Sequence, residues 1–551
     1  MYVYDDYDRQ ILTDRVKQYR GQTDRYLKGE LSENEFLPLR LQNGLYIQRL
    51  APMLRVCVPY GMLNTKQIRK LAELSRKYDK GYVHFSTRQN VQFNWPALEH
   101  VPEMLKELAE VEMHAIQTSG NCIRNTTTDQ FAGVSPDEHE DPRAYCEIIR
   151  QWSTFHPEFA FLPRKFKMAV CGSTDDRAAI RVHDIAIEIV KDANGEVGFR
   201  MLVGGGLGRT PVVAPVIKDF LPKQHLLSYL EAVLRVYNQM GRRDNKYKAR
   251  IKILVRAMGV EAFSEAVEAE WAHLKDGPAT LHEEEFQRMK SFFTAPQYKQ
   301  LDNEESLSAV QAQRAEDIAF DKWVSRSVRT HKVAGYSSVT LSTKPTGVAP
   351  GDVTDKQLEQ LADLADEFSF SEMRTTHSQN CVLADVETTE LYALWKKAKA
   401  IGLATPNVGF LTDMICCPGG DYCALANAKS IPVAEAIQRR FDNIDYLHDL
   451  GPIDLNISGC MNACGHHHVG HIGILGVDKK GEEFYQVMLG GNSGLNTSLA
   501  KVLGPSFKAE EVSDVIAKIL TTFTQLRNDE ELFIDTYRRV GIKPFKESVY
   551  A

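Results

Sequence analysis

The sequence predicts an α+β protein built by internal duplication, with two halves of roughly 250 residues related by a pseudo-twofold axis. A helix followed by a strand occurs twice, and the glutamines that bracket it are 22 residues apart in both copies, residues 67–89 and 357–379. A strand, a turn and a second strand also recur, with nine residues from the turn glycine to a glycine run in 195–204 and again in 481–490. The copies are separated by 290 and 286 positions, so the two pairs share one order and almost one offset. Chance similarity between two common patterns is the alternative.

The first half begins with a segment of about 44 residues that is rich in charged side chains, and this segment predicts a helical arm lying on the rest of the chain. Thr65 starts an amphipathic helix with apolar residues at i, i+3 and i+4, and the following strand ends in Thr87-Arg88-Gln89-Asn90. Ile185–Val190 alternates like a strand, residues 192–196 read as a hairpin turn, and a second strand runs into Leu202–Gly206.

The second half repeats these elements in the same order. A helix begins near Asp355, and its strand ends in Thr376–Asn380. Ile472–Val477, the turn at 478–482 and the run into Met488–Gly491 form the second hairpin. Between the halves, residues 215–330 are helix-rich and polar and are interpreted as a helical extension and connector.

Composition narrows the function classes. With 43% hydrophobic and 25% charged residues, the 551-residue chain is not disordered, collagenous or a coiled coil. The net charge of −7 provides no global basic field for nucleic acid or anionic lipid. The start lacks the apolar core of a signal peptide, and no stretch approaches the ~20 apolar residues of a membrane span, so we expect a soluble cytoplasmic protein.

Four cysteines form the strongest motif, Cys417-x5-Cys423 and then, after a gap of 36 residues, Cys460-x3-Cys464. Four thiolates can hold a zinc ion or a [4Fe–4S] cluster. Structural zinc usually takes C-x2-C knuckles, whereas the wider x5 and x3 spacings suit the larger cubane, and neighbouring glycines let the backbone approach it. The sequence therefore predicts a cluster, with zinc and inert core thiols as alternatives.

Other cysteines and a group of histidines are interpreted as structural. We expect five cysteines to be small buried residues: Cys57, Cys146, Cys171, Cys381 and Cys416. The histidines near the second cysteine pair suggest a metal site, but we expect them to lie on a polar surface around a glycine-rich turn: His466, His467, His468 and His471.

Four strand-like segments carry cations among apolar neighbours, although the chain is acidic overall. They contain Arg55, Arg88 with Gln92, Arg124, and Arg164-Lys165-Phe166-Lys167. Lys165 and Lys167 alternate across Phe166, so a strand would direct both to one face. Any one segment alone would be a solvated surface charge, but together they predict a buried site for a small oxyanion or a cofactor with many carboxylates. The basic run at 241–248 is isolated and mixed, which favours a solvated helix face over a nucleic-acid patch.

Taken together, these motifs resemble the sirohaem-dependent sulfite and nitrite reductases and are most similar to the sulfite reductase haemoprotein. The resemblance rests on the cysteine motif, Leu162–Lys167 (LPRKFK), Thr87-Arg88-Gln89 and Leu202–Gly206 (LVGGG), and extends from about residue 45 to near the end of the chain. It implies a duplicated architecture in which ferredoxin-like half-domains accompany two α+β domains that bind sirohaem and the cluster. The implied boundaries are 1–44 for the arm, 45–115 and 326–402 for the half-domains, 116–325 for a sirohaem and substrate domain with a helical extension, and 403–551 for the cluster and sirohaem domain.

The resemblance also implies roles for individual residues. The cluster ligands would be Cys417, Cys423, Cys460 and Cys464, and the Cys464 thiolate would also bind the sirohaem iron. The substrate-facing cations would be Arg55, Arg124, Lys165 and Lys167. Sirohaem-binding positions would be Arg88, Gln92, Arg164, Gly204, Gly205, Gly206 and Asn462. His84 stands where some relatives carry an arginine toward the sirohaem, which would make a contact with a carboxylate pH-dependent.

The implied reaction is the six-electron reduction of sulfite to sulfide, with nitrite to ammonia as the alternative on the same fold. Lys167 favours sulfite, because a dianion needs more positive charge and plant-type nitrite reductases tend to show Lys-Trp-Asn at this place. No P-loop is present and residues 204–209 fail G-x-G-x-x-G, so we expect an external electron donor, a ferredoxin or a flavoprotein reductase subunit. A non-enzymatic iron–sulfur or zinc scaffold is the rival from another class, although a scaffold would not need an anion pocket.

Overall fold

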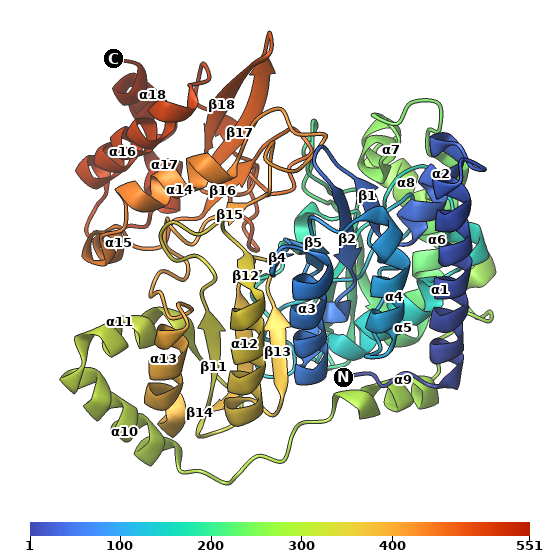
Figure 1. The fold of residues 1–551 in the computed structure, drawn as a ribbon, viewed down its shortest axis with the longest axis horizontal. Coiled ribbons are helices and arrows are strands. Elements are labelled where there is room, and N and C mark those ends of the chain that lie inside the picture. Colours follow the sequence, from blue (N-terminus) through green and yellow to red (C-terminus); the bar gives the residue numbers. More distant parts are fainter.

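The computed structural model describes residues 1–551 and contains four β-sheets that form two matching pairs (Figure 1). The predicted α+β class and the internal duplication are both confirmed by this pairing. None of the helices is both long enough and apolar enough to cross a membrane.

The first pair of sheets shows the duplication strand by strand. One sheet has the order β1-β2-β5-β4-β12 and the other has the equivalent order β10-β11-β14-β13-β3. The first-half strands are β1 (Leu45–Ile47), β2 (Pro52–Val56), β3 (Met62–Asn64), β4 (Tyr82–Phe85) and β5 (Val91–Phe93). The second-half strands are β10 (Val328–Thr330), β11 (Tyr336–Leu341), β12 (Asp352–Thr354), β13 (Glu372–Thr375) and β14 (Cys381–Glu387).

The two halves exchange one strand each. β12 of the second half pairs antiparallel with β4, and β3 of the first half pairs antiparallel with β13. Each sheet is therefore completed by the other half, so the halves cannot separate without breaking backbone hydrogen bonds.

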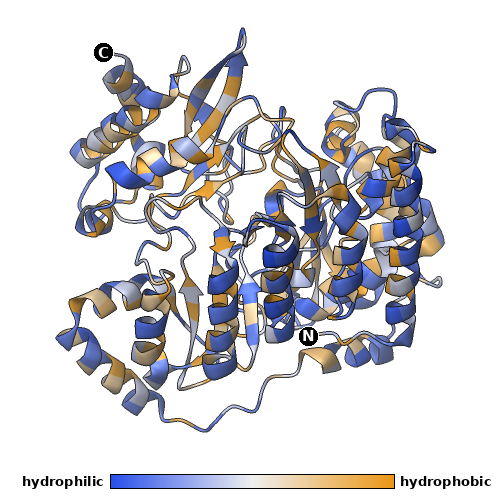
Figure 2. Cartoon of the chain, in the orientation of Figure 1, coloured by the Kyte–Doolittle hydropathy of each residue, from blue (hydrophilic) through white to orange (hydrophobic).

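Two equivalent helices, one from each half, pack against each other. α3 (Thr65–Tyr78) and α12 (Asp355–Phe368) lie side by side (Figure 1). Each begins with a capping box in which the third helical residue, Gln67 or Gln357, bonds back to the N-cap. The apolar faces of α3 and α12 enter one shared core of 44 buried residues. The outer faces of α3 and of the N-terminal helix α1 (Asp6–Leu27) are mainly hydrophilic (Figure 2).

The second pair of sheets carries the predicted hairpins. The third sheet contains β6 (Met168–Cys171), β7 (Ile185–Lys191), β8 (Val197–Val203) and β9 (Val216–Pro222) in sequence order. The fourth contains β15 (Ile415–Cys416), β16 (Leu455–Ser458), β17 (Ile472–Lys479), β18 (Glu482–Leu489) and β19 (Lys501–Val502). In both, a parallel pair is followed by an antiparallel hairpin, whose turn glycines, Gly195 and Gly481, have φ of 85° and 90°.

Helices cover the sheets and connect the halves, as expected for residues 215–330. The connecting helices are α6 (Leu226–Met240), α7 (Ile251–Met258), α8 (Val260–Leu274), α9 (Glu283–Lys290), α10 (Asn303–Glu316) and α11 (Ile318–Ser327). The remaining helices are α4 (Val101–Ala109), α5 (Arg143–Ser153), α13 (Leu391–Ala400), α14 (Ile431–Arg440), α15 (Ile444–Leu450), α16 (Ala509–Leu526), α17 (Phe533–Val540) and α18 (Lys543–Tyr550).

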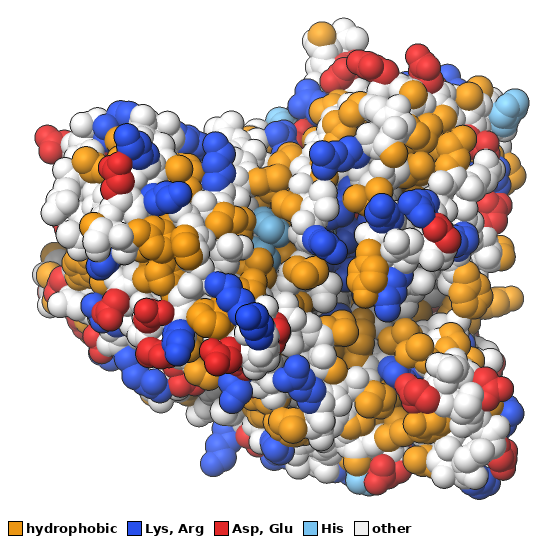
Figure 3. Space-filling view, turned by 90° about the horizontal axis from the view of Figure 1, so that it is seen from above, with side chains coloured by type: hydrophobic (Ala, Val, Ile, Leu, Met, Phe, Trp, Pro, Cys, Tyr) orange, Lys and Arg blue, Asp and Glu red, His pale blue; other side chains and the backbone are white.

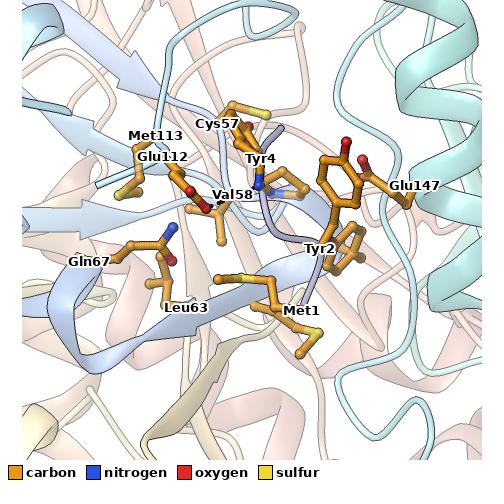
Figure 4. Close-up of a pocket in the computed structure, with 13 residues that line it drawn as sticks. Met1, Tyr2, Tyr4, Cys57, Val58, Leu63, Gln67, Glu112, Met113 and Glu147 are labelled. Carbon is orange, nitrogen blue, oxygen red and sulfur yellow. Dashed lines mark hydrogen bonds between the residues drawn. The ribbon is translucent and has the colours of Figure 1, made fainter. Parts of the chain in front are cut away.

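The predicted N-terminal arm consists of α1 (Asp6–Leu27) and α2 (Glu33–Gln42), and α1 packs on α4. Ahead of α1, Tyr2 and Tyr4 are buried beside a small cavity of about 20 Å³, where Glu147 also lies (Figure 4). The Arg150 guanidinium lies over both tyrosine rings, 5.7 and 5.4 Å from their centroids, and donates to the Glu147 carboxylate at 2.8 and 2.6 Å. The arm is thus anchored on a buried ion pair.

An Arg150→Leu variant should lose about 3–5 kcal/mol of stability, because the Glu147 charge would remain buried without a partner. Urea denaturation followed by circular dichroism measures the loss. The control is Arg9→Leu, which breaks solvent-exposed ion pairs with Asp6 and Glu112 and should cost about 0–1 kcal/mol. Equal losses in the two variants would contradict the buried-pair interpretation.

Candidate active site

The structure brings the cysteine loops of the C-terminal part against the cationic segments of the N-terminal part. The Thr87 hydroxyl donates to the backbone oxygen of Cys464 at 2.9 Å. The charge of Cys464 also acts on the pKa values of Lys165 and Lys167. From above, Lys and Arg side chains gather around a hollow near the middle of the molecule (Figure 3).

The cysteine motif begins at the ends of two neighbouring strands. Cys417 directly follows β15, and Cys460 follows β16 by two residues. β15 and β16 are parallel, so both cysteines leave the sheet at the same edge. Cys464 is exposed, while Cys417 and Cys423 are half-buried.

Local chemistry around Cys417 fits a thiolate bound to a metal cluster. The Gly459 amide donates to the Cys417 Sγ at 3.2 Å, a contact that stabilises negative charge on sulfur. Burial, followed by the charge of Cys464, raises the pKa of the Cys417 thiol to about 12 and that of Cys460 to about 11. Metal binding must therefore displace protons from these thiols.

The backbone of the second cysteine loop is packed very closely. A Cβ at position 465 would lie 1.9 Å from the Ile457 oxygen, so only glycine allows the chain to turn back here. Nowhere in the chain do three or more His, Cys, Asp or Glu side chains converge for a single metal ion. Four thiols in close-packed glycine loops fit the donor set of a [4Fe–4S] cluster.

Arg55, Gln92 and Arg124 line one side of the site. Arg55 lies on β2 opposite Gln92 on β5, and its guanidinium donates to the Gln92 Oε1 at 3.0 and 2.7 Å. Arg124 is fixed by the backbone oxygens of Thr118 and Gly120, at 2.8 and 2.7 Å. Neither arginine has a carboxylate partner in the chain, so both remain available to an external anion.

Lys165 and Lys167 lie together, as their alternation predicts. Both lysine side chains are half-buried. This burial lowers the pKa of Lys165 to about 8, against the opposing charge of Cys464. Burial and then the charge of Lys165 lower the pKa of Lys167 well below its usual range. An anion bound between them would restore both protons.

Arg88 and Arg164 are also cations without an acidic partner. Arg88 is buried and donates to the Thr127 hydroxyl at 2.6 Å and to the Met168 oxygen at 3.1 Å. Burial lowers its pKa to about 9. Arg164 is half-buried, and burial followed by the charge of Arg124 lowers its pKa. These uncompensated charges fit a cofactor that carries many carboxylates.

Close backbone contacts hold the predicted glycine run, residues 204–206, in place. The Gly204 amide donates to the Asp184 oxygen at 2.9 Å, and Gly206 pairs with Val212 through two bonds of 2.9 Å. A Cβ on Gly205 would lie 2.5 Å from the His183 oxygen, so the backbone here approaches its neighbours more closely than any side chain permits. Asn462 is exposed in the cysteine loop and hydrogen-bonds to the Cys460 thiol, which lowers the pKa of that thiol against the effect of burial.

His84 lies in a different set of contacts from the other expected cofactor-binding residues. Its ring is buried, with Nδ1 2.8 Å from the Asp352 carboxylate and Nε2 3.1 Å from the Gln379 amide nitrogen. The carboxylate that His84 contacts here belongs to Asp352 of the chain, and a contact with a sirohaem carboxylate stays a prediction.

The histidines near Cys464 are a correction to the sequence analysis. All four are buried rather than on a polar surface: His466, His467, His468 and His471. His466 packs against His377 with ring centroids 4.7 Å apart, and the His468 Nε2 lies 3.0 Å from the Gly208 oxygen. Burial lowers the pKa of His468 to about 4, so this ring is neutral and packs as part of the interior. The five cysteines expected to be small buried residues are buried as predicted.

Several residues near the site were missed by the sequence analysis. Arg250 donates to the Asp184 carboxylate at 2.7 Å, and the other Asp184 oxygen accepts from the Lys167 amide at 2.8 Å. Lys252 donates to the oxygens of Leu207 and Thr210, both at 2.6 Å, and so fixes the loop after the glycine run. Both lie in or beside α7, and only their contacts across the fold identify them.

The lowered pKa of Lys165 predicts a pH dependence. The cationic form of Lys165 would bind an anionic substrate, so kcat/KM for that substrate should be constant below pH 8 and fall as the pH rises through about 8. Initial rates with a viologen dye as electron donor measure this profile. In Lys165→Arg the fall should move to higher pH, because a guanidinium stays protonated. An unchanged profile in this variant would assign the titration to another group.

The chain is similar to known proteins over most of its length. Residues 119–275 and 409–551 match the family described as the nitrite and sulphite reductase 4Fe-4S domain, and residues 48–111 and 332–401 match the nitrite/sulfite reductase ferredoxin-like half domain. The chain is 28% identical over 495 residues to sulfite reductase (ferredoxin) 1 of Mycolicibacterium paratuberculosis, covering 87% of this chain and 81% of the relative. It is also 28% identical over 518 residues to the chloroplastic ferredoxin–nitrite reductase of Arabidopsis thaliana, covering 90% and 80%. The solved structure of the Mycobacterium tuberculosis NirA protein superimposes with a TM-score of 0.77 at 26% identity and 95% coverage of both chains.

Proposed function

Because the chain belongs to the nitrite and sulphite reductase family, we propose that it reduces sulfite to sulfide in a six-electron reaction at a sirohaem coupled to a [4Fe–4S] cluster. It is an oxidoreductase with a 4Fe-4S domain. The observation that carries the substrate choice is the pair of half-buried lysines, Lys165 and Lys167, neither of which has an ion-pair partner in the chain. A dianion compensates two such charges better than a monoanion does.

In this proposal the four cysteines hold the cofactors: Cys417, Cys423, Cys460 and Cys464, with Cys464 shared between the cluster and the sirohaem iron. Arg88, Arg164, Gln92, Asn462 and the 204–206 glycine run surround the sirohaem, and the uncompensated arginines support this placement because its carboxylates need cationic partners. When bound, the two groups would relay the electrons of an external donor and provide an open metal position for the substrate.

The substrate-facing residues are then Arg55, Arg124, Lys165 and Lys167. The arginines hold the oxygens of the anion, because their guanidinium groups are fixed by Gln92 and by the Thr118 and Gly120 oxygens and need no reorganisation. The lysine ammonium groups donate protons as the S–O bonds break and oxygen leaves as water. The lowered lysine pKa values support this role, since proton transfer is most effective from a group that titrates near the working pH.

We also propose that the chain divides at the boundaries expected from the sequence, with two half-domains at 45–115 and 326–402 around which the other units assemble. The electron donor would be a separate protein of the cytoplasm, a ferredoxin or a flavoprotein reductase subunit. A ferredoxin has the stronger support, because relatives over most of this chain carry that donor in their names.

Nitrite reduction to ammonia is the second candidate, because a relative of equal identity is a nitrite reductase. Turnover with reduced viologen on sulfite and on nitrite, preceded by a visible spectrum, tests the choice. We expect haem absorption bands and a kcat/KM for sulfite at least as high as that for nitrite. A colourless protein would refute the cofactor assignment, and a much higher kcat/KM for nitrite would refute the substrate.

A further inference from the structure

Two tight turns occupy equivalent positions in the two half-domains. Residues 86–90 connect β4 to β5, and residues 376–380 connect β13 to β14. Each turn is closed by a bond between its first and last residues, at 2.9 Å for Ser86 and Asn90 and 3.0 Å for Thr376 and Asn380. The fourth residue of each is a glutamine with positive φ, 58° at Gln89 and 66° at Gln379.

Gln89 uses its side chain as a clamp between two segments. Its Oε1 accepts from the Thr128 amide at 3.1 Å, and its Nε2 donates to the Thr375 oxygen at 3.1 Å. Gly61 packs directly against this amide, since a Cβ at position 61 would lie 2.6 Å from the Gln89 Nε2.

Gln379 makes the same clamp in the second half. Its Oε1 accepts from the Cys416 amide at 2.8 Å, and its Nε2 lies 2.9 Å from the Phe85 oxygen, the counterpart of Thr375 at the end of β4. Gly351 packs against it as Gly61 packs against Gln89, with a Cβ distance of 2.8 Å.

The two clamps differ in what they hold. Gln379 bonds both sides of Cys416, because its Nε2 also lies 3.0 Å from the Cys416 oxygen. Cys416 directly precedes Cys417, whose Sγ accepts from the Gly459 amide. Gln89 holds Thr128, whose next residue is Asp129 rather than a cysteine. Only the second clamp therefore acts on the cysteine motif.

His84 and Asp352 in turn fix Gln379. The His84 Nε2 lies 3.1 Å from the Gln379 amide nitrogen, and the His84 Nδ1 lies 2.8 Å from the Asp352 carboxylate. Gln379 and His84 are 1% and 5% exposed, so water does not replace these bonds. Asp352 on the exchanged strand β12 pairs with His84 on β4, so each half-domain contributes to this chain of contacts.

We propose that Gln379 is a positioning residue for the cluster, and that the Asp352–His84–Gln379 chain sets the orientation of Cys417 and the reduction potential of the cluster. This rests on the proposed function, since it takes Cys417 as a cluster ligand. Hydrogen bonds to cluster sulfurs stabilise the reduced form. Gln379 fixes the peptide before Cys417 and so keeps its sulfur within reach of the Gly459 amide.

The test compares Gln379→Met with Gln89→Met in the purified holoprotein. Methionine keeps the length of glutamine but provides no amide, so each variant loses one clamp and should lose thermal stability. We expect Gln379→Met to shift the midpoint potential of the cluster to more negative values and to change its electron paramagnetic resonance spectrum. Gln89→Met should leave the potential and the spectrum as in the wild type. Equal shifts in both variants, or no shift in Gln379→Met with full iron content, would overturn the proposal.

His84→Phe provides the second measurement and decides the matter if Gln379→Met fails to fold. It removes both imidazole bonds but keeps an aromatic ring. We expect a smaller shift of the same sign, and a wild-type potential in this variant would overturn the proposal. The iron and acid-labile sulfide contents of the wild type distinguish failure of the proposed function from failure of the positioning role. A wild-type protein that binds no cluster refutes the proposed function. A bound cluster whose potential does not shift in the variants refutes only the positioning role of Gln379.

Discussion

A Cys464→Ser variant is expected to lose the cluster signal and the sirohaem bands together, and with them all measurable turnover of sulfite. The proposed ligand set makes one thiolate common to both groups, and a serine hydroxyl is a much poorer ligand for iron at neutral pH. The Thr87 contact to the Cys464 oxygen would remain, because it involves only the backbone. Visible absorption, iron content and dye-linked turnover measure the three losses.

The matched control for this result is Cys171→Ser. The Cys171 thiol is buried, with the Ser173 and Asp175 oxygens 3.4 and 3.5 Å from its sulfur, and its single hydrogen can be donated to either oxygen, as that of a serine hydroxyl can. This variant should keep its cofactors and its turnover. If Cys464→Ser retained full sulfite turnover, the shared-ligand assignment would be wrong.

A Lys167→Met variant is expected to lower kcat/KM for sulfite by about 10²–10³-fold, equivalent to about 2.7–4 kcal/mol of transition-state stabilisation. Methionine occupies a similar volume but supplies neither charge nor proton. The loss should be smaller for nitrite, because the attraction of a monoanion to the removed positive charge is about half that of a dianion. Dye-linked initial rates with both substrates measure the difference.

Lys167→Arg separates charge from proton donation. A guanidinium keeps the positive charge but does not release its proton. We therefore expect this variant to bind sulfite with a KM near that of the wild type and to lose mainly kcat. Equal losses of kcat/KM for sulfite and nitrite in Lys167→Met would argue against the dianion as the preferred substrate.

The duplicated fold could be predicted because it leaves a periodic record in the sequence. Gln67 and Gln357 recur at one offset because both complete a capping box, and Gly195 and Gly481 recur because both hairpin turns need positive φ. The exchange of β3 and β12 could not be predicted. Each is a three-residue strand, and its choice of partner sheet depends on contacts far away in the sequence.

The candidate site shows the same division. Cysteine spacing and the Lys165–Lys167 alternation are local patterns and were readily identified. Arg250 was missed because its only signal is an ion pair with Asp184, 66 positions away. The buried histidines were misjudged because polar residues beside glycines usually indicate surface, whereas here His466 packs against His377 and His468 contacts Gly208, both far away in the sequence.

The exchanged strands also constrain how the chain folds during synthesis. The edge of β4 is completed by β12, which begins at residue 352, whereas β4 ends at residue 85. At about 5–20 residues per second, a ribosome needs on the order of 15–50 seconds to make the intervening chain. During that interval the first sheet has an open edge beside an apolar core, a surface prone to aggregation that a chaperone can protect.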